Sequence, residues 1–257
     1  MKTDNNKPMI EAVNLTKRYE DGFLALDVLN LEVGAGEIYC LLGANGAGKT
    51  TTINLFLNLI RPTSGRASVC GIDVTSESFE AKKRLAYVSE HVLLYSNFTA
   101  RENLEFFVKL GGKRDLKRED YHMALREVGL QEKAFEQRVA ELSKGMRQKL
   151  GIAIAKALDP PVIILDEPTA GLDPRAAADC LELLDDMRTH GKSILMTTQD
   201  IFRAKDIANR VGIMKEGRKV VEHTRGELAN ENLEDLYLNY MRGGFQPGKE
   251  EQPKPDS

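Results

Sequence analysis

The chain has 257 residues, of which 42% are hydrophobic and 29% are charged, so it can build a sizeable core. Its formal net charge of −3, with both signs interspersed, gives no basic field around which nucleic acid could wrap, so we expect no nucleic acid among its partners. Cys40, Cys70 and Cys180 are far apart and lack CxxC spacing, which indicates reduced packing thiols rather than disulfides or a zinc site.

Membrane and targeting segments are not indicated. Residues 1–13 lack the apolar region of a secretion signal, and no stretch approaches the ~18 apolar residues that a membrane helix needs. We therefore expect a cytoplasmic chain that does not span a membrane itself. A partner with membrane helices is compatible with this composition.

The chain opens with short segments of strand composition. Residues 9–19, 24–33 and 37–42 are separated by turn residues at Asp21-Gly22 and at 34–36, a pattern typical of an antiparallel sheet. After Thr50 the spacing of apolar residues predicts a helix, in which one face carries Ile53, Phe56, Leu57 and Ile60. We expect Arg61-Pro62 to end that helix. Short strands at 66–74 and 84–90 follow, and helical spacing dominates from Thr99 to about Ala157, interrupted by the polar residues 111–118.

The second half of the chain alternates strands and helices. Residues 161–168 and 193–200 are apolar runs of strand length, with a helix between them that ends at Gly191. Such alternation predicts an α/β fold with a mostly parallel sheet. Residues 243–257 are rich in Gly, Pro and charge, so we expect a disordered tail.

The sequence GANGAGKT, residues 43–50, matches the phosphate-loop pattern between a strand and a helix. Its glycines let backbone N–H groups face inward, and the following helix adds its positive end. Lys49 is expected to reach the β- and γ-phosphates and the Thr50 hydroxyl to join a Mg²⁺ shell. The alternative is a glycine-rich turn with an incidental lysine. The residues expected at the nucleotide are Gly43, Asn45, Gly46, Ala47, Gly48, Lys49, Thr50 and Thr51.

Two carboxylates end the strand in residues 161–168. Asp166 emerges where open α/β sheets bind ligands, so we expect it to hold Mg²⁺ with Thr50. Glu167 points differently and is the candidate catalytic base for the attacking water. The alternative for this adjacent pair is a solvated turn.

Three motifs together, ELSKGMRQKLGIAIAKAL, VIILDEPTAGLDP and the phosphate loop, resemble the ATP-binding subunits of ABC transporters. The resemblance covers about Met9 to Met241, and residues 142–146 are similar to the family's Leu-Ser-Gly-Gly-Gln signature. It implies an ATPase that uses ATP and Mg²⁺, with a P-loop NTPase core, an N-terminal antiparallel β subdomain and an inserted α-helical lobe. The implied single domain covers residues 1–242, with the core at 1–89 and 156–242 and the lobe at 90–155.

The signature follows the helical region. Ser143 is expected to cap the helix from Lys144 through Leu158, which creates a second anion site. In the family, the signature of one subunit closes over the ATP of another, so the resemblance implies a homodimer or heterodimer. The alternative is an ordinary N-capped helix. The signature residues implied to face the partner's ATP are Ser143, Lys144, Gly145 and Met146.

Other positions follow from the resemblance. It implies that Tyr19 stacks on adenine and that Asp173 lies at the subunit interface; the alternatives are a sheet tyrosine and a cap before Pro174. Two departures from the family pattern matter for the chemistry. Glu90 replaces a glutamine and is expected to bind Mg²⁺, and Gln199 replaces a switch histidine and cannot carry a proton near neutral pH. We therefore expect catalysis by Lys49, Glu167 and Gln199 to be slower than in a histidine-bearing relative.

A membrane partner is also implied. Residues 90–141 lie where the family docks an integral membrane permease, which places the chain peripherally on the inner face of the cell membrane. Within this region 95–107 is the expected contact, unless its apolar side chains are lobe core; their exposure decides. The chain length and the signature most resemble single-domain subunits of bacterial exporters, although importer subunits share the catalytic motifs. The apolar side chains in question are Phe98, Leu104, Phe106 and Phe107.

Two other classes of function are open on these motifs. A soluble P-loop kinase would use the same phosphate loop but has no use for the signature and its long helix. A regulatory ATP-dependent clamp with slow turnover is favoured by Glu90 and Gln199. Co-purification separates them, since a polytopic membrane protein in the native complex supports transport.

Overall fold

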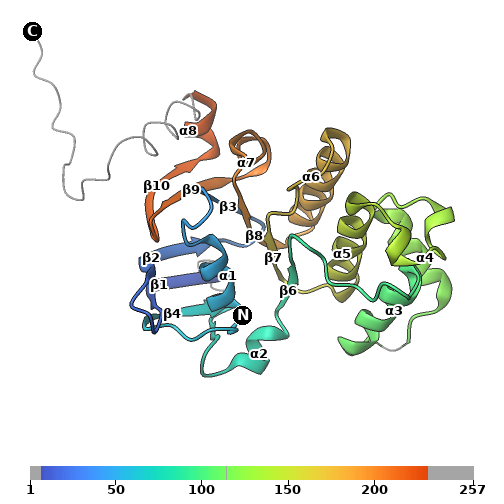
Figure 1. Cartoon of the computed structure of the whole chain (residues 1–257), viewed down its shortest axis with the longest axis horizontal. Coiled ribbons are helices and arrows are strands. Elements are labelled where there is room, and N and C mark those ends of the chain that lie inside the picture. Colours follow the sequence, from blue (N-terminus) through green and yellow to red (C-terminus); the bar gives the residue numbers. More distant parts are fainter. Residues whose placement is uncertain (1–6, 114, 231–257) are drawn as a thin grey trace, which may run out of the picture.

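The computed structural model describes residues 7–113 and 115–230, so the prediction for residues 243–257 lies outside the described residues. Within these ranges the chain forms two β-sheets and a group of helices (Figure 1). None of the described helices is both long enough and apolar enough to cross a membrane. The helices α3, α4 and α5 gather at one end of the molecule, and β1, β2 and β4 lie at the other (Figure 1).

The first sheet is antiparallel and the second is mostly parallel. The first has the order β2-β1-β4-β5, with β1 (Ile10–Arg18), β2 (Leu24–Val33), β4 (Ser64–Val69) and β5 (Ile72–Asp73). The second has the order β10-β9-β3-β8-β7-β6, and in it β9 and β10 pair antiparallel while the other neighbours are parallel. Its strands are β3 (Ile38–Leu42), β6 (Leu85–Val88), β7 (Val162–Asp166), β8 (Ser193–Thr198), β9 (Arg210–Lys215) and β10 (Arg218–Thr224). The expected α/β class is confirmed.

One strand lies in a different sheet from the one predicted. Residues 37–42 were expected to continue the antiparallel sheet, but β3 lies in the parallel sheet between β8 and β9. All five of its residues are buried, because each face of this central strand meets a different core. A continuous apolar run is typical of a parallel sheet covered on both faces, whereas β1 and β2 mix buried with exposed residues.

The helices follow the predicted order. α3, α4 and α5 fall in the region of helical spacing, and α5 begins at Lys144 after the Ser143 cap, as expected. The lobe bounds 90–155 stay a prediction. The helices are α1 (Lys49–Phe56), α2 (Ser78–Lys82), α3 (Ala100–Leu110), α4 (Arg118–Glu127), α5 (Lys144–Leu158), α6 (Pro174–Thr189), α7 (Ile201–Ile207) and α8 (Arg225–Asn230), with 3₁₀ turns at Glu132–Ala134 and Val139–Glu141.

Helix α1 ends earlier than the apolar spacing predicts. The helix was expected to run to Arg61-Pro62, yet it ends at Phe56. Asn58 adopts a left-handed backbone conformation with φ 47°. The N–H groups of Asn58 and Leu59 then bond back to the carbonyls of Leu55 and Asn54, a helix stop that asparagine tolerates.

The parallel sheet separates two hydrophobic cores, because side chains alternate along each strand. In β3, Ile38 packs on the side of the helical lobe, whereas Tyr39 packs on the side of α1 and the antiparallel sheet. The lobe core is continuous with the first side and includes Leu104 and Leu125. Among the cysteines, Cys40 and Cys180 are buried and Cys70 is half-buried, all as free thiols. Burial, with a smaller effect from Glu167, raises the pKa of Cys40, which suits a packing role.

Candidate nucleotide site

The alternation along β7 directs Asp166 toward α1. Val162 and Ile164 pack in the core on the α1 side, and Asp166 is the next residue of that face. Its Oδ2 accordingly lies 3.3 Å from the Thr50 Oγ1 at the start of α1. On the neighbouring strand β8, Thr197 faces the same way and donates a hydrogen bond of 2.5 Å to Asp166 Oδ1. The sheet thus brings the end of β7 to the phosphate loop.

The phosphate loop curls as its glycines require. Gly46 and Gly48 have φ values of 80° and 105°, which side chains rarely adopt. A Cβ on Gly43 would lie 2.7 Å from the Met214 carbonyl, so the loop packs closely against β9. Lys49 is buried and donates hydrogen bonds to the carbonyls of Gly43 at 2.6 Å and Ala44 at 3.2 Å. The loop therefore surrounds the ammonium group.

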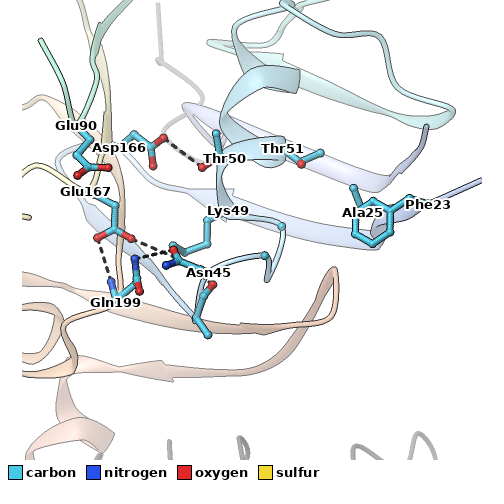
Figure 2. A pocket seen from close by; sticks show the side chains of 13 residues that line it. Phe23, Ala25, Asn45, Lys49, Thr50, Thr51, Glu90, Asp166, Glu167 and Gln199 are labelled. Carbon is cyan, nitrogen blue, oxygen red and sulfur yellow. Dashed lines mark hydrogen bonds and ion pairs between the residues drawn. The ribbon is translucent and has the colours of Figure 1, made fainter. Parts of the chain in front are cut away.

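A pocket opens between this loop and the ends of β7 and β8 (Figure 2). Most of the predicted nucleotide, catalytic and metal residues line it, although they come from four separate parts of the chain. The structure adds Phe23, Ala25 and Ala44. The predicted residues in its lining are Asn45, Gly46, Gly48, Lys49, Thr50, Thr51, Glu90, Asp166, Glu167 and Gln199.

Glu167 occupies a special backbone position next to Asp166. Its φ of 47° is left-handed, and its N–H donates to the Thr197 carbonyl at 3.2 Å and the Thr197 hydroxyl at 3.1 Å. This bend turns the side chain out of the strand, so Oε1 lies 3.2 Å from Lys49 Nζ. Among the described residues, that buried oxygen accepts no hydrogen bond. Because buried polar atoms are usually hydrogen-bonded, a buried carboxylate oxygen without a hydrogen bond beside a buried ammonium marks this pocket as a candidate functional site.

Gln199 lines the pocket beside Glu167 and Asn45 (Figure 2). Its backbone N–H donates to Glu167 Oε2 at 3.2 Å, and its Nε2 donates to Asn45 Oδ1 at 2.9 Å (Figure 2). The residue therefore connects the end of β8 with both the second carboxylate and the phosphate loop.

The oxygen groups of the pocket fit Mg²⁺. Mg²⁺ is usually held by one or two carboxylates together with substrate phosphates and water, not by a full protein cage. Thr50 and Asp166 already lie within hydrogen-bonding distance, and Glu90 lines the same pocket. Within the described ranges, no group of three or more His, Cys, Asp and Glu side chains could hold a metal by itself. The donor set thus suits an ion that is bound jointly with a nucleotide.

The signature residues form a second region, apart from the first pocket. Ser143 caps α5 by accepting a hydrogen bond of 3.2 Å from the Met146 N–H. Ser143, Gly145 and Met146 line a shallow hollow beside Ala176 of α6. Lys144 does not line this hollow, and its Nζ lies 3.6 Å from Glu90 Oε1.

Two further predicted residues lie elsewhere. Tyr19 does not line the pocket; it starts the turn that Phe23 completes, and the Lys17 Nζ lies 5.2 Å from the centre of its ring. Phe23 is the aromatic residue in the lining, and its place after the Asp21-Gly22 turn was the sequence signal for it. Asp173 caps α6 by accepting a hydrogen bond of 3.0 Å from the Ala176 N–H. The cap interpretation of Asp173 is therefore correct, and its interface role stays a prediction.

Comparison with known proteins assigns the family. The family model described as ABC transporter matches residues 26–170. The chain belongs to the ABC transporter family of ATP-binding proteins. It is 39% identical over 213 residues to the "Nod factor export ATP-binding protein I" of Burkholderia orbicola (strain AU 1054), which covers 83% of this chain and 70% of the relative.

Further relatives agree with this family. A daunorubicin resistance ATP-binding protein of Streptomyces coeruleorubidus is 37% identical over 238 residues, covering 90% of this chain and 73% of the relative. A solved "ATP binding subunit of ABC transporter" superimposes with a TM-score of 0.79 at 30% identity, covering 91% of this chain and 99% of that one. A dimeric ATP-binding cassette with bound ADP and Pi gives a TM-score of 0.77 at 28% identity, covering 84% and 99%. The pocket thus lies in a chain whose family consists of ATP-binding ATPases.

Proposed function

We propose that this chain is the ATP-hydrolysing subunit of an ABC exporter and that it acts by ATP-driven closure of a dimer against a separate membrane permease. The observation that carries the proposal is the pocket in which Lys49, Asp166 and Glu167 meet. The export assignment is supported by two relatives whose names describe Nod factor export and daunorubicin resistance. In this proposal the permease, and not this chain, determines which compound is transported.

The phosphate loop, the metal-binding oxygens and one aromatic residue have separate proposed roles in nucleotide binding. The N–H groups of residues 43–50 cradle the phosphates, and Lys49 exchanges its loop carbonyls and Glu167 for the β- and γ-phosphates. Thr50 and Asp166, with Glu90 beside them, hold Mg²⁺, which neutralises phosphate charge when bound. Adenine packs against an aromatic residue of the first hairpin, either Tyr19 as predicted or Phe23, which lines the pocket.

Glu167 is the proposed catalytic base. Its Oε1 is buried, forms an ion pair with Lys49 and accepts no hydrogen bond from the described residues, so once Lys49 turns away it can accept the proton of a water molecule that attacks the γ-phosphate. Lys49 releases this carboxylate when it turns to the phosphates. The left-handed backbone of Glu167 stores strain that keeps the side chain in this direction.

Gln199 is the proposed reason for slow turnover. At the position of the family's switch histidine, its amide can donate a hydrogen bond to the γ-phosphate but cannot relay a proton. In the structure the amide is already engaged by Asn45 at 2.9 Å. Both features limit hydrolysis and leave nucleotide binding to the phosphate loop, which is the property of the alternative regulatory clamp.

The proposed second subunit completes each ATP site. Ser143, Gly145 and Met146 form the N-terminal turn of α5, where N–H groups and the helix dipole suit an anion. They do not line the pocket that contains Lys49, so one chain offers two half-sites. A head-to-tail dimer would close one chain's signature over the nucleotide of the other, with Asp173 near the contact.

The proposed permease contact is an aromatic patch formed by Tyr95, Phe98, Phe106 and Phe107. Tyr95, Phe98 and Phe106 are 48%, 39% and 36% exposed, whereas Leu104 is fully buried in the lobe core. The Tyr95 and Phe106 ring centres lie 4.9 Å apart. Buried Asn103 fixes the loop by accepting a hydrogen bond from the Tyr95 N–H at 2.8 Å and donating one to the Tyr95 carbonyl at 3.0 Å. A preorganised exposed aromatic group suits a protein partner.

Co-purification from detergent-solubilised membranes tests the proposal. The tagged native chain is expected to bring down a polytopic membrane protein, identified by mass spectrometry, and the complex is expected to hydrolyse ATP. Phe106→Ser should weaken this capture, whereas Phe79→Ser should not, although Phe79 in α2 is 73% exposed. Capture of soluble proteins alone would favour the regulatory clamp, and transfer of phosphate to a small acceptor would favour a kinase.

A further inference from the structure

The side chains of Glu90 and Lys144 connect the two half-sites of one chain. Lys144 Nζ lies 3.6 Å from Glu90 Oε1. Glu90 lines the phosphate pocket, whereas Lys144 is the first residue of the signature helix α5. Glu90 stands where the family has a glutamine, and Lys144 where its signature has a glycine. Two residues that differ from the family pattern and lie far apart in the sequence therefore form an ion pair in the structure.

A negative partner stabilises Lys144 at its position in the helix. A cation in the first turn of a helix opposes the positive end of the helix dipole, and α5 has no acidic residue in its first turn. Glu90 supplies that charge from the loop after β6. The lysine side chain also lies over the loop after β7, where a Cβ on Gly171 would be 3.1 Å from Nζ. Lys144 is thus placed between the two loops that carry the pocket carboxylates.

The Glu90 carboxylate faces Lys144 and also lines the pocket that fits Mg²⁺, and its Oε1 lies 3.8 Å from Nδ1 of the exposed His91. We propose that the Glu90–Lys144 ion pair couples the two ATP sites of the dimer. When Glu90 turns to Mg²⁺ at its own phosphate site, Lys144 is released for the phosphates of the nucleotide held by the partner subunit. The inference rests on the proposed function, because the second site exists only in a dimer.

The exposure of the two side chains limits the free energy that their ion pair can contribute to the coupling. The Lys144 and Glu90 side chains are 34% and 40% exposed, so water screens their attraction. Partly exposed ion pairs contribute up to about 1 kcal/mol, which corresponds to a change in a dissociation constant of about two- to fivefold. Such a coupling adjusts the order of events at the two sites without blocking either of them.

Nucleotide binding to the monomer isolates the ion pair from the dimer. The dissociation constant of a non-hydrolysable ATP analogue with Mg²⁺ is measured on the full chain, at concentrations where sedimentation gives a monomer. Since Lys144 does not line the phosphate pocket, it acts there through Glu90. Lys144→Gln is expected to tighten binding about two- to fivefold, because it leaves Glu90 to Mg²⁺. In the Glu90→Gln background, adding Lys144→Gln should not tighten nucleotide binding. In a titration without Mg²⁺, Lys144→Gln should not tighten it either.

Dimer formation gives a second readout of opposite sign. With the analogue and Mg²⁺ present, Lys144→Gln should weaken the dimer about two- to fivefold, because a contact to the partner's nucleotide is lost. A merely structural role of Lys144 would not strengthen one equilibrium and weaken the other. Lys82→Gln removes an equal charge from an exposed lysine of α2 that lines neither the phosphate pocket nor the signature hollow, and it should change neither equilibrium. Matching thermal unfolding midpoints verify that the variants fold, and Lys144→Ala serves as a second substitution.

Three results separate a failure of the coupling from a failure of the proposed function. If Lys144→Gln changes monomer binding equally with Glu90 and with Gln at position 90, the coupling is wrong while the proposed function stands. An unchanged dissociation constant in both backgrounds overturns the coupling in the same way. If the unsubstituted chain binds no nucleotide, the proposed function fails and the coupling fails with it.

Discussion

Gln199 donates a hydrogen bond of 2.9 Å from its Nε2 to Asn45 Oδ1, which connects the end of β8 directly to the phosphate loop. The backbone N–H of Gln199 also donates to Glu167 Oε2 at 3.2 Å. One residue thus contacts both the loop proposed to hold the phosphates and the carboxylate proposed to activate water. Substitutions at this point separate binding from hydrolysis.

Gln199→His is expected to raise the steady-state ATPase rate about tenfold, which is below the ~10²-fold effect of a well-placed acid–base group. Histidine can accept and donate a proton near neutral pH, which an amide cannot do. The rate is measured with saturating ATP and Mg²⁺. An ATPase rate that stays at the level of the unsubstituted chain would show that Gln199 does not limit turnover.

Glu167→Gln should reduce ATP turnover by about 10²- to 10⁴-fold, the usual contribution of a general base. The amide keeps the shape of the side chain, so nucleotide binding should persist and can be measured by calorimetry. Glu141→Gln, at an exposed position of the lobe, is the matched control and should hydrolyse ATP normally. Equal turnover in the two variants would remove Glu167 from its role.

Arg210→Met is expected to destabilise the fold by about 2 kcal/mol, because two carboxylates would lose a half-buried, hydrogen-bonded partner. The Arg210 guanidinium contacts Glu37 Oε2 at 2.9 Å and Glu222 Oε1 at 2.8 Å, and their hydrogen bonds raise the pKa of the arginine. Denaturant unfolding measures the free energy. Arg61→Met, at an exposed site, should change it by less than about 0.5 kcal/mol, and equal effects would contradict the importance of this network.

Glu136 should make the helical lobe sensitive to acid. Burial by itself would raise the pKa of Glu136, but hydrogen bonds from Arg101, Arg118 and His122 outweigh it and lower the pKa to about 2. Because this value lies below the ordinary 4.5, the contribution to stability is complete above about pH 4.5 and is lost as the pH falls toward 2. The contribution is about 1 kcal/mol, since the side chain is 42% exposed.

Glu136→Gln tests this dependence. The difference in unfolding free energy between the two proteins should be present near neutral pH and shrink as the solution is acidified through about pH 4.5. Denaturant titrations at several pH values measure it. A difference that stays constant over this range would mean that the Glu136 charge is not the stabilising feature.

Local patterns in the sequence predicted the chemistry of the site better than its full arrangement. Asp166 and Glu167 were correctly expected at the end of an apolar strand, because strand length and alternation are local properties. The early stop of α1 was missed, since the left-handed conformation of Asn58 overrides apolar spacing. The Glu90–Lys144 contact could not be predicted, because it depends on how the loop after β6 meets the start of α5.

The sheet membership of β3 shows the same limit. Its neighbours in space, β8 and β9, come from the distant end of the chain, so the local turn pattern before it suggested an antiparallel partner. Likewise, Phe23 enters the pocket lining and Tyr19 does not, although both flank the same turn. The direction of a side chain in a hairpin depends on register, which the sequence alone leaves open.

Mixing two inactive variants tests the central claim that each ATP lies between the phosphate loop of one chain and the signature of another. Lys49→Ala removes the phosphate-binding ammonium, and Ser143→Arg obstructs the signature. With Mg²⁺ and a non-hydrolysable ATP analogue, each variant alone should sediment as a monomer, whereas an equimolar mixture should form heterodimers through one intact composite site. A mixture that stays monomeric, while the unsubstituted chain dimerises under the same conditions, would contradict this account.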